Sequence, residues 1–253
     1  MTQDQRHESI LKLLKERDSI SIEELVEHYK VTPQTIRRDL THLAKLNKLR
    51  RHHGGASVVS SIQNMAYQTR KIMDLEAKQK IAQHLVSMIP NGSSLFINIG
   101  TTTETIAKAL LSHENLKVVT NNLNVAAILG VKKDFSVLIA GGEVRHRDGG
   151  IIGETTEDFI NQFRMDFGII GISGIEENGS LLDFDYREVR VAQAIIKNSR
   201  KVLLAADNSK FGRCAMVRLG NISQADDFIT DAKPPKSILT LLSEHDVKLH
   251  IAR

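Results

Sequence analysis

Basic and amide side chains gather between residues 28 and 57. Seven Lys or Arg residues stand there against one acid, a net charge of +6 (7 − 1), whereas the whole 253-residue chain carries +4. Clustered positive charge is typical of a surface that binds the phosphate backbone of nucleic acid. Arg pairs bidentately with guanine and Gln with adenine, so this stretch also has side chains able to read bases. The side chains expected to contact a DNA duplex are Thr32, Gln34, Thr35, Arg37, Arg38, Lys45, Arg50, Arg51, His52 and His53.

Two of these assignments have alternatives. Arg37 and Arg38 also have the chemistry to form surface salt bridges, for instance with Asp39 or Glu24. His52 and His53 are the residue type that binds metals, but adjacent residues in a strand point apart. No Cys or further His stands at ligand spacing, so no metal site is expected.

A second group with binding chemistry is Gly100-Thr101-Thr102-Thr103, between an apolar run and a helical pattern. Glycine lets the backbone come close to an anion, a helix N-terminus offers N–H groups, and Thr hydroxyls add donors. Lys210 would supply a positive charge for a phosphate or carboxylate, or it is a surface lysine without a ligand. Asn121 and Asp183 are the other residues expected at this effector site. Asp183 and Asp185 either contact ligand hydroxyls or cap the following helix.

Helical patterns and a hairpin pattern position the N-terminal residues. Ser21 and Glu24 have the spacing of a capping box for a helix that ends near residues 28–30. Thr32 is a helix cap with Pro33 at the first helical position. Residues 49–56 predict two short strands around a glycine turn, which together with the helices describes a winged helix-turn-helix. Apolar stripes are expected at Ile10, Leu11, Leu13, Leu14, Ile36, Leu40, Leu43 and Leu46.

The rest of the chain alternates apolar strands with helices, which predicts the α/β class with a mostly parallel sheet covered on both faces. Strands are expected at 94–99, 117–120, 136–140, 166–170, 201–206, 227–230 and 247–251, and helices at 76–89, 101–111, 123–130, 187–198 and 235–244. Polar or glycine clusters follow several strands, where ligands of open α/β sheets bind. We expect a DNA-binding domain over 1–57, a linker over 58–75 and an effector-sensing domain over 76–253.

The run from Thr32 to Leu40, followed by Arg51-His52-His53-Gly54-Gly55-Ala56, resembles the DNA-binding signature of the DeoR family of bacterial repressors. Residues 76–240 are similar to the sensor domain of that family, which is itself similar to ribose-5-phosphate isomerase and related sugar-phosphate isomerases. The resemblance implies that residues 100–103 bind phosphate and that Lys210 lines the pocket. Where the isomerases carry Asp-Gly-Ala-Asp, this chain has Gly171-Ile172-Ser173-Gly174. Enolisation needs a carboxylate base, so we expect no catalytic residue and no cofactor.

Further stretches are similar to DeoR-family members that control glycerol and glycerol-phosphate use: 120–126, 148–154, 184–186, 209–213 and 215–217. That similarity implies glycerol 3-phosphate as the inducer, operator DNA as the partner and a homo-oligomeric repressor. Two alternatives stay open, a repressor that responds to another sugar phosphate and an active isomerase fused to a DNA-binding domain.

Composition argues against several other classes. No apolar run approaches the roughly 18 residues of a membrane span, and the N-terminal residues lack the apolar core of a signal peptide. A single cysteine, Cys214, permits no internal disulfide. We therefore expect a cytoplasmic protein without a membrane partner.

Overall fold

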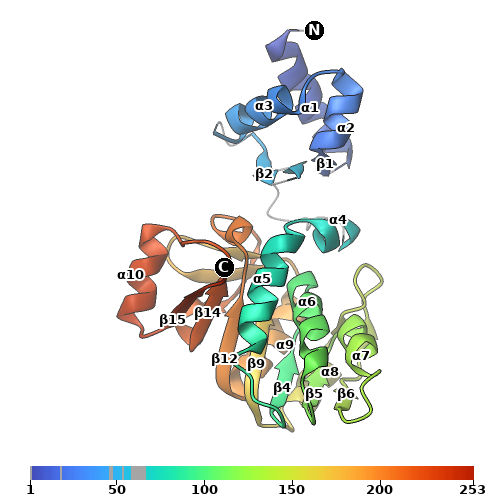
Figure 1. The fold of residues 1–253 in the computed structure, drawn as a ribbon, viewed down its shortest axis with the longest axis vertical. Helices are drawn as coiled ribbons and strands as arrows, with labels where there is room; N and C mark the ends of the chain where they lie inside the picture. The colour runs from blue at the N-terminus through green and yellow to red at the C-terminus, as the bar shows by residue number, and fades with distance from the viewer. Residues whose placement is uncertain (1, 18, 46–47, 53, 58–66) are drawn as a thin grey trace. The chain divides into compact units, whose positions relative to one another are not determined.

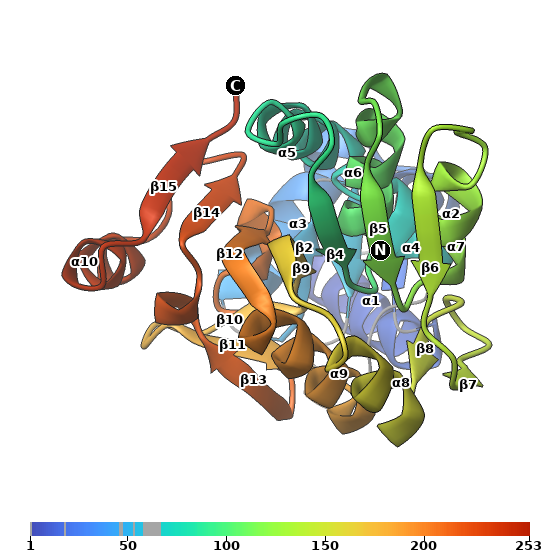
Figure 2. The same cartoon turned by 90° about the horizontal axis from the view of Figure 1, so that it is seen from below.

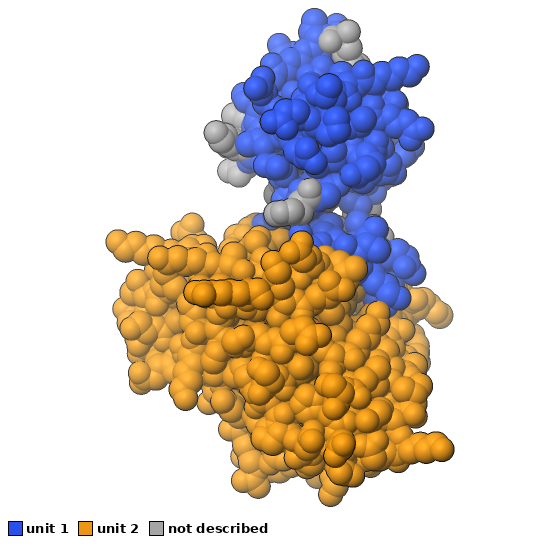
Figure 3. All heavy atoms as spheres, in the orientation of Figure 1, with its two compact units in different colours: residues 1–74 blue, residues 75–253 orange. Residues whose placement is uncertain are grey.

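The structure is a computed structural model that describes residues 2–17, 19–45, 48–52, 54–57 and 67–253. It divides into two compact units, residues 1–74 and 75–253, which are coloured separately in Figure 3. His53, Leu46 and residues 58–66 of the expected linker lie outside the described residues. Among the described residues, no helix has the length and apolar character needed to cross a bilayer.

The N-terminal unit consists of helices packed on a small antiparallel sheet with strand order β1-β3-β2 (Figure 1). Its described elements are α1 (Gln3–Arg17), β1 (Ser19–Ser21), α2 (Ile22–Tyr29), α3 (Pro33–Lys45), β2 (Arg50–His52), β3 (Gly55–Ser57) and α4 (Tyr67–Ile72). The buried core contains Ile10, Leu14, Ile20, Ile22, Leu25, Ile36, Leu40, Leu43, Leu49 and Ala56. The wing and the apolar stripe of α3 are therefore as predicted, apart from Leu46. Helix α4 falls within the segment that sequence analysis interpreted as linker.

Local hydrogen bonds explain where the helices α2 and α3 begin. The Ser21 hydroxyl accepts a bond from the Glu24 N–H at 3.1 Å, and the Glu24 carboxylate accepts one from the Ser21 N–H at 2.8 Å. This is the predicted capping box, which satisfies two otherwise orphaned groups. Helix α2 ends at Tyr29, and the left-handed conformation of its C-cap Lys30 (φ 52°) turns the chain toward α3. The Thr32 hydroxyl then accepts a bond from the Thr35 N–H at 3.3 Å.

The second unit is built on a parallel sheet with strand order β15-β14-β12-β9-β4-β5-β6. The strands of this sheet are β4 (Ser94–Ile97), β5 (Lys117–Thr120), β6 (Ser136–Ile139), β9 (Met165–Gly171), β12 (Ser199–Ala205), β14 (Asp227–Thr230) and β15 (Lys248–Ile251). The α-helices of the unit are α5 (Leu75–Val86), α6 (Thr101–Ala109), α7 (Leu123–Leu129), α8 (Glu154–Ile160), α9 (Tyr186–Lys197) and α10 (Lys236–Glu244). The α/β class predicted from the sequence is confirmed.

Apolar residues alternate between the two faces of this sheet, because successive side chains of a strand point to opposite sides. One face packs under α5, α6 and α7, and the other packs against α8, α9 and α10; Figure 2 shows the layers. Toward the first face point Leu95, Ile97, Val118, Ile169, Leu203 and Ile229. Toward the second face point Phe96, Val119, Ile170, Val202, Leu204 and Phe228. All parallel strands therefore end at one polar edge, while both faces are buried.

Short elements that sequence analysis did not predict lie beside this edge. Strands β10 (Gly174–Ile175), β11 (Ser180–Asp183) and β13 (Val217–Asn221) form an antiparallel sheet. Strands β7 (Glu143–Val144) and β8 (Ile151–Ile152) form a hairpin around residues 145–150. Helix α8 was also missed. These elements are short, so they lack the long periodic run from which an element is recognised.

Candidate DNA-binding surface and effector site

Helix α3 presents a polar face opposite its apolar stripe. Thr32, Gln34, Arg37 and Arg38 are exposed and Thr35 is half-buried. Lys45 is the last residue of the helix. The first two turns therefore offer amide, hydroxyl and guanidinium groups to a partner, the arrangement by which a recognition helix contacts bases and phosphates.

Buried Asp39 does not pair with its neighbours Arg37 and Arg38. Its carboxylate accepts bonds from Arg6 Nε at 2.6 Å and Gln3 Nε2 at 3.2 Å, and its Oδ1 lies 3.0 Å from His7 Nε2. Burial alone would raise the pKa of Asp39, but the bonds from Arg6 and His7 outweigh it and hold that pKa below its usual value. Asp39 thus ties α3 to α1. Because the Glu24 carboxylate accepts the Ser21 N–H in the capping box of α2, both acids proposed as partners for the two arginines have other roles.

The two arginines of the wing differ in their exposure to solvent. Arg51 is exposed and its Nη1 donates to Thr41 Oγ1 at 2.9 Å, which links the wing to α3, while Arg50 is half-buried. His52, which was predicted to contact DNA, is 7% exposed, and its Nε2 lies 2.8 Å from Ser57 Oγ. His52 therefore cross-links the two strands of the hairpin.

Gly100 and the first turn of α6, which sequence analysis predicted as an anion-binding loop, lie at the end of β4. Gly100 has φ 153° and ψ 151°, a conformation that is essentially restricted to glycine. Thr101 and Thr102 are buried near the helix N-terminus. The Thr103 hydroxyl differs from the prediction that it faces a ligand, because it donates to the carbonyl oxygens of Asn98 at 2.9 Å and Gly100 at 2.7 Å. The first turn of a helix also carries backbone N–H groups that have no partner within the helix, and such groups can bind an anion.

Asn98 joins the ends of the neighbouring strands β4 and β9. Its Nδ2 donates to the Gly171 carbonyl at 3.2 Å, and its Oδ1 accepts from the Gly171 N–H at 2.9 Å. A Cβ atom at position 171 would lie 3.4 Å from Thr103 Cγ2, so the two glycine-containing loops adjoin. At Gly174 a Cβ atom would lie 2.1 Å from the Arg213 carbonyl oxygen. Position 174 therefore has no room for an acidic side chain.

Lys210 lies in a charged group at the end of β12. Its Nζ is 3.6 Å from Asp207 Oδ2, and its side chain is only 12% exposed. Burial would raise the pKa of Asp207, but the charges of Lys210 and Lys78 hold it below its usual value. Lys78, in α5, is buried as well. Sequence analysis missed Lys78 because an isolated lysine in a helix carries no signal of burial.

Asn121, Asp183 and Asp185 form hydrogen bonds with residues near the carboxyl ends of the parallel strands. The Asn121 Nδ2 donates to the Ile151 carbonyl at 2.9 Å, which ties the end of β5 to β8. Asp185 caps α9 by accepting a bond from the Arg187 N–H at 3.0 Å. Asp183 Oδ1 accepts bonds from Ser173 Oγ at 3.0 Å and from the Phe184 N–H at 2.7 Å. The capping alternative is thus seen at Asp185.

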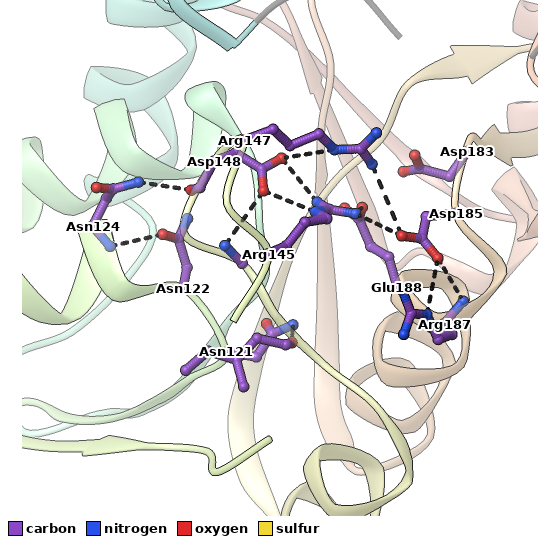
Figure 4. Close-up of polar contacts among 12 residues, drawn as sticks. Asn121, Asn122, Asn124, Arg145, Arg147, Asp148, Asp183, Asp185, Arg187 and Glu188 are labelled. Atoms are coloured by element: carbon purple, nitrogen blue, oxygen red, sulfur yellow. Dashed lines mark hydrogen bonds and ion pairs between the residues drawn. The ribbon is translucent and has the colours of Figure 1, made fainter. Parts of the chain in front are cut away.

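Arg145 is the centre of an ion-pair network that sequence analysis did not predict (Figure 4). Its guanidinium lies 2.8 and 2.9 Å from the two carboxylate oxygens of Asp148, 3.1 Å from Asp185 and 2.7 Å from Glu188. Burial and the nearby Asp183 raise the pKa of Glu188 to about 8, although Arg145 opposes them. The network fixes the β7–β8 loop against the first turn of α9.

The same loop is also held from the other side. Asn124 Nδ2 donates to the Asp148 carbonyl at 2.9 Å and to Glu104 Oε1 at 3.1 Å, so α6, α7 and the loop are joined. Within the described parts of the chain, no group of three or more His, Cys, Asp or Glu residues is arranged to hold a metal ion.

Both parts of the chain match known protein families. Residues 6–62 match the family described as the DeoR-like helix-turn-helix domain, and residues 73–232 match the DeoR C terminal sensor domain. The chain belongs to the DeoR family. The family resemblance read from the sequence is therefore confirmed.

Full-length relatives within the DeoR family are also similar. The chain is 57% identical over 251 residues to the glycerol-3-phosphate regulon repressor of Escherichia coli (strain K12), with 99% of this chain and 100% of that protein covered. It is 53% identical over 249 residues to the protein of the same name from Haemophilus influenzae, with 98% and 97% covered.

Among solved structures, ribose 5 phosphate isomerase A from Neisseria gonorrhoeae is similar with a TM-score of 0.40 and 16% sequence identity. The match covers 53% of this chain and 52% of that one. A likeness of this size carries no argument about the activity of a DeoR-family protein.

Proposed function

We propose that this DeoR-family protein is a sequence-specific DNA-binding repressor of genes for glycerol and glycerol 3-phosphate use. The observation that supports this most directly is its 57% identity, over 99% of the chain, to a glycerol-3-phosphate regulon repressor. Residues 1–57 would bind operator DNA and residues 76–253 would bind the effector, with 58–75 as the linker. The protein would act as a regulator and not as an enzyme, which agrees with the closed position at Gly174.

The DNA-binding surface would be the exposed face of α3 together with the wing. Gln34, Arg37 and Arg38 would read base edges, whereas Arg51 would contact the phosphate backbone. A helix-turn-helix usually binds as a pair to two half-sites, so we propose a homo-oligomer whose symmetry matches that of the operator.

The effector would be a small phosphorylated metabolite bound at the carboxyl edge of the parallel sheet. The N-terminal turn of α6 is suited to phosphate, because its N–H groups and helix dipole attract an anion. Lys210 and Lys78 supply positive charge at the same edge of the sheet. We propose glycerol 3-phosphate as this effector, with Asp183 as a partner for hydroxyl groups. The effector shifts operator affinity only by as much as it favours one arrangement of the protein over another.

The test is a fluorescence-anisotropy titration of a labelled operator at several salt concentrations. We expect affinity to fall as salt rises and glycerol 3-phosphate to release the DNA. Lys210→Gln should bind the operator normally but need at least about tenfold more glycerol 3-phosphate for release, equivalent to about 1.4 kcal/mol. Lys197→Gln, a change at an exposed lysine of α9, should behave as the unchanged protein.

Each part of the proposal has its own contrary result. Operator binding that ignores salt would overturn the DNA-binding role. Release by a different phosphorylated metabolite, with no response to glycerol 3-phosphate, would retain the repressor and replace its inducer. A monomeric mass by light scattering, both free and on operator DNA, would overturn the homo-oligomer.

A further inference from the structure

A histidine pair lies in the second unit away from the residues described so far. His84 belongs to the last turn of α5, and His250 belongs to the edge strand β15, so the chain brings together residues 166 positions apart. The His84 Nε2 and the His250 Nδ1 are hydrogen-bonded to each other at 3.3 Å, and the ring centres are 5.2 Å apart. His84 is half-buried, and the side chain of His250 is 26% exposed, so both are accessible from solvent.

The spacing of these two nitrogens matches what a zinc ion requires. Zinc bonds to histidine nitrogen are about 2.0–2.1 Å long, so two such nitrogens on one tetrahedral ion lie about 3.3 Å apart. The 3.3 Å between His84 Nε2 and His250 Nδ1 equals this span.

The opposite nitrogen of His250 has the partner that metal-binding histidines usually have. Its Nε2 lies 2.6 Å from Asp227 Oδ1, and the other oxygen of that carboxylate lies 2.7 Å from Lys201 Nζ. Asp227 is 1% exposed. A carboxylate in this place keeps the proton on Nε2, leaves the lone pair on Nδ1 and fixes the ring orientation. His84 would then move its own proton to its Nδ1, so that its Nε2 lone pair also faces the ion.

We propose that His84 and His250 form a zinc-binding site in the second unit, with Asp227 positioning His250 and water completing the coordination. Imidazole nitrogen is a ligand that suits zinc. The site is separate from the proposed effector site. Its two protein ligands make it a site of reversible binding that ties α5 to the edge of the sheet.

The experiment is calorimetric titration of the full-length protein with zinc chloride, after removal of metal with a chelator. We expect one zinc ion per chain and a higher unfolding temperature when zinc is bound. His84→Gln and His250→Gln should each weaken binding at least tenfold, and Asp227→Asn should weaken it about 10- to 100-fold. His245→Gln changes an exposed histidine of the same unit and should leave binding unchanged.

Circular dichroism of each variant establishes that it is folded before its affinity is compared. The proposal is overturned if the unchanged protein takes up no zinc saturably, or if His84→Gln and His250→Gln bind as it does. A loss in His245→Gln comparable to the other losses would likewise overturn it, because zinc would then be bound by scattered surface histidines. Unchanged affinity in Asp227→Asn would refute the positioning role of Asp227.

Discussion

Replacement of Asp39 by alanine should destabilise the DNA-binding unit without removing any group that faces DNA. Asp39 accepts hydrogen bonds from Arg6 and Gln3 and lies 3.0 Å from His7 Nε2, and all three residues belong to α1. A bond to a charged group contributes about 1.5–3 kcal/mol and a neutral bond about 0.5–1.5 kcal/mol. The expected loss is therefore about 3 kcal/mol, because Arg6 would also be left buried without its partner. A unit of this size has a total stability of only about 4–11 kcal/mol.

The assay is urea unfolding, monitored by hydrogen exchange of the backbone amides in α1 and α3. These amides report on the N-terminal unit alone, which is needed because a two-unit chain need not unfold in a single step. Glu8→Ala, a change at an exposed acid of α1, is the control. The double variant Arg6→Met/Asp39→Leu should recover most of the loss, because an apolar pair replaces a buried ion pair at little cost. A loss below about 1 kcal/mol in Asp39→Ala, no larger than in Glu8→Ala, would refute this reasoning.

The lowered pKa of Asp39 also sets the direction of its pH dependence. A carboxylate with a depressed pKa stabilises the fold above its ordinary pKa, and this stabilisation is lost as pH falls through the depressed value. The difference between Asp39→Ala and the unchanged protein should therefore shrink in acid.

Three other predictions follow from the two sites. Arg37→Ala should weaken operator binding by about 1–3 kcal/mol in a gel-shift titration, and unchanged affinity would mean that α3 is not the recognition helix. Gly100→Ala should lose about 1–3 kcal/mol of stability to backbone strain and blunt effector release, as measured by thermal unfolding and operator release. The raised pKa of Glu188 should make the second unit less stable as pH rises from about 4.5 to about 8, because the unfolded chain gives up the proton first. Glu188→Gln should flatten this dependence, and an equally steep profile in that variant would contradict the assignment.

Features that depend on neighbouring residues were predicted well. The caps at Ser21 and Thr32 lie within one turn of their partners, so their spacing alone reveals them. Strands 117–120 and 227–230 have the bounds that their apolar runs predicted. A strand buried on both faces needs a continuous apolar run, and such a run is visible without knowledge of the fold.

Features that depend on distant residues were not predicted. Arg145 forms ion pairs with Asp185 and Glu188, about forty positions further along the chain. No local sequence pattern predicts a contact over this separation. Buried Lys78 lies close enough to Asp207, far along the chain, to lower the pKa of that carboxyl, and no local pattern indicates this pairing. The burial of His52 was not predicted, because a three-residue strand is too short for its inward face to be identified from alternation.

The pairing of β1 with β3 has a consequence for how fast and how selectively DNA is bound. Ile20 pairs with Ala56, and a Cβ atom at Gly55 would lie 2.2 Å from the Ile20 carbonyl, so the two strands are in tight contact. Strand β2, which carries Arg51, pairs with β3 in the protein without DNA, so under the proposed function the entropy of pairing these strands is not lost on binding. Duplexes whose backbone does not fit this preset shape gain nothing from adjustment of the hairpin, so preorganisation turns rigidity into discrimination.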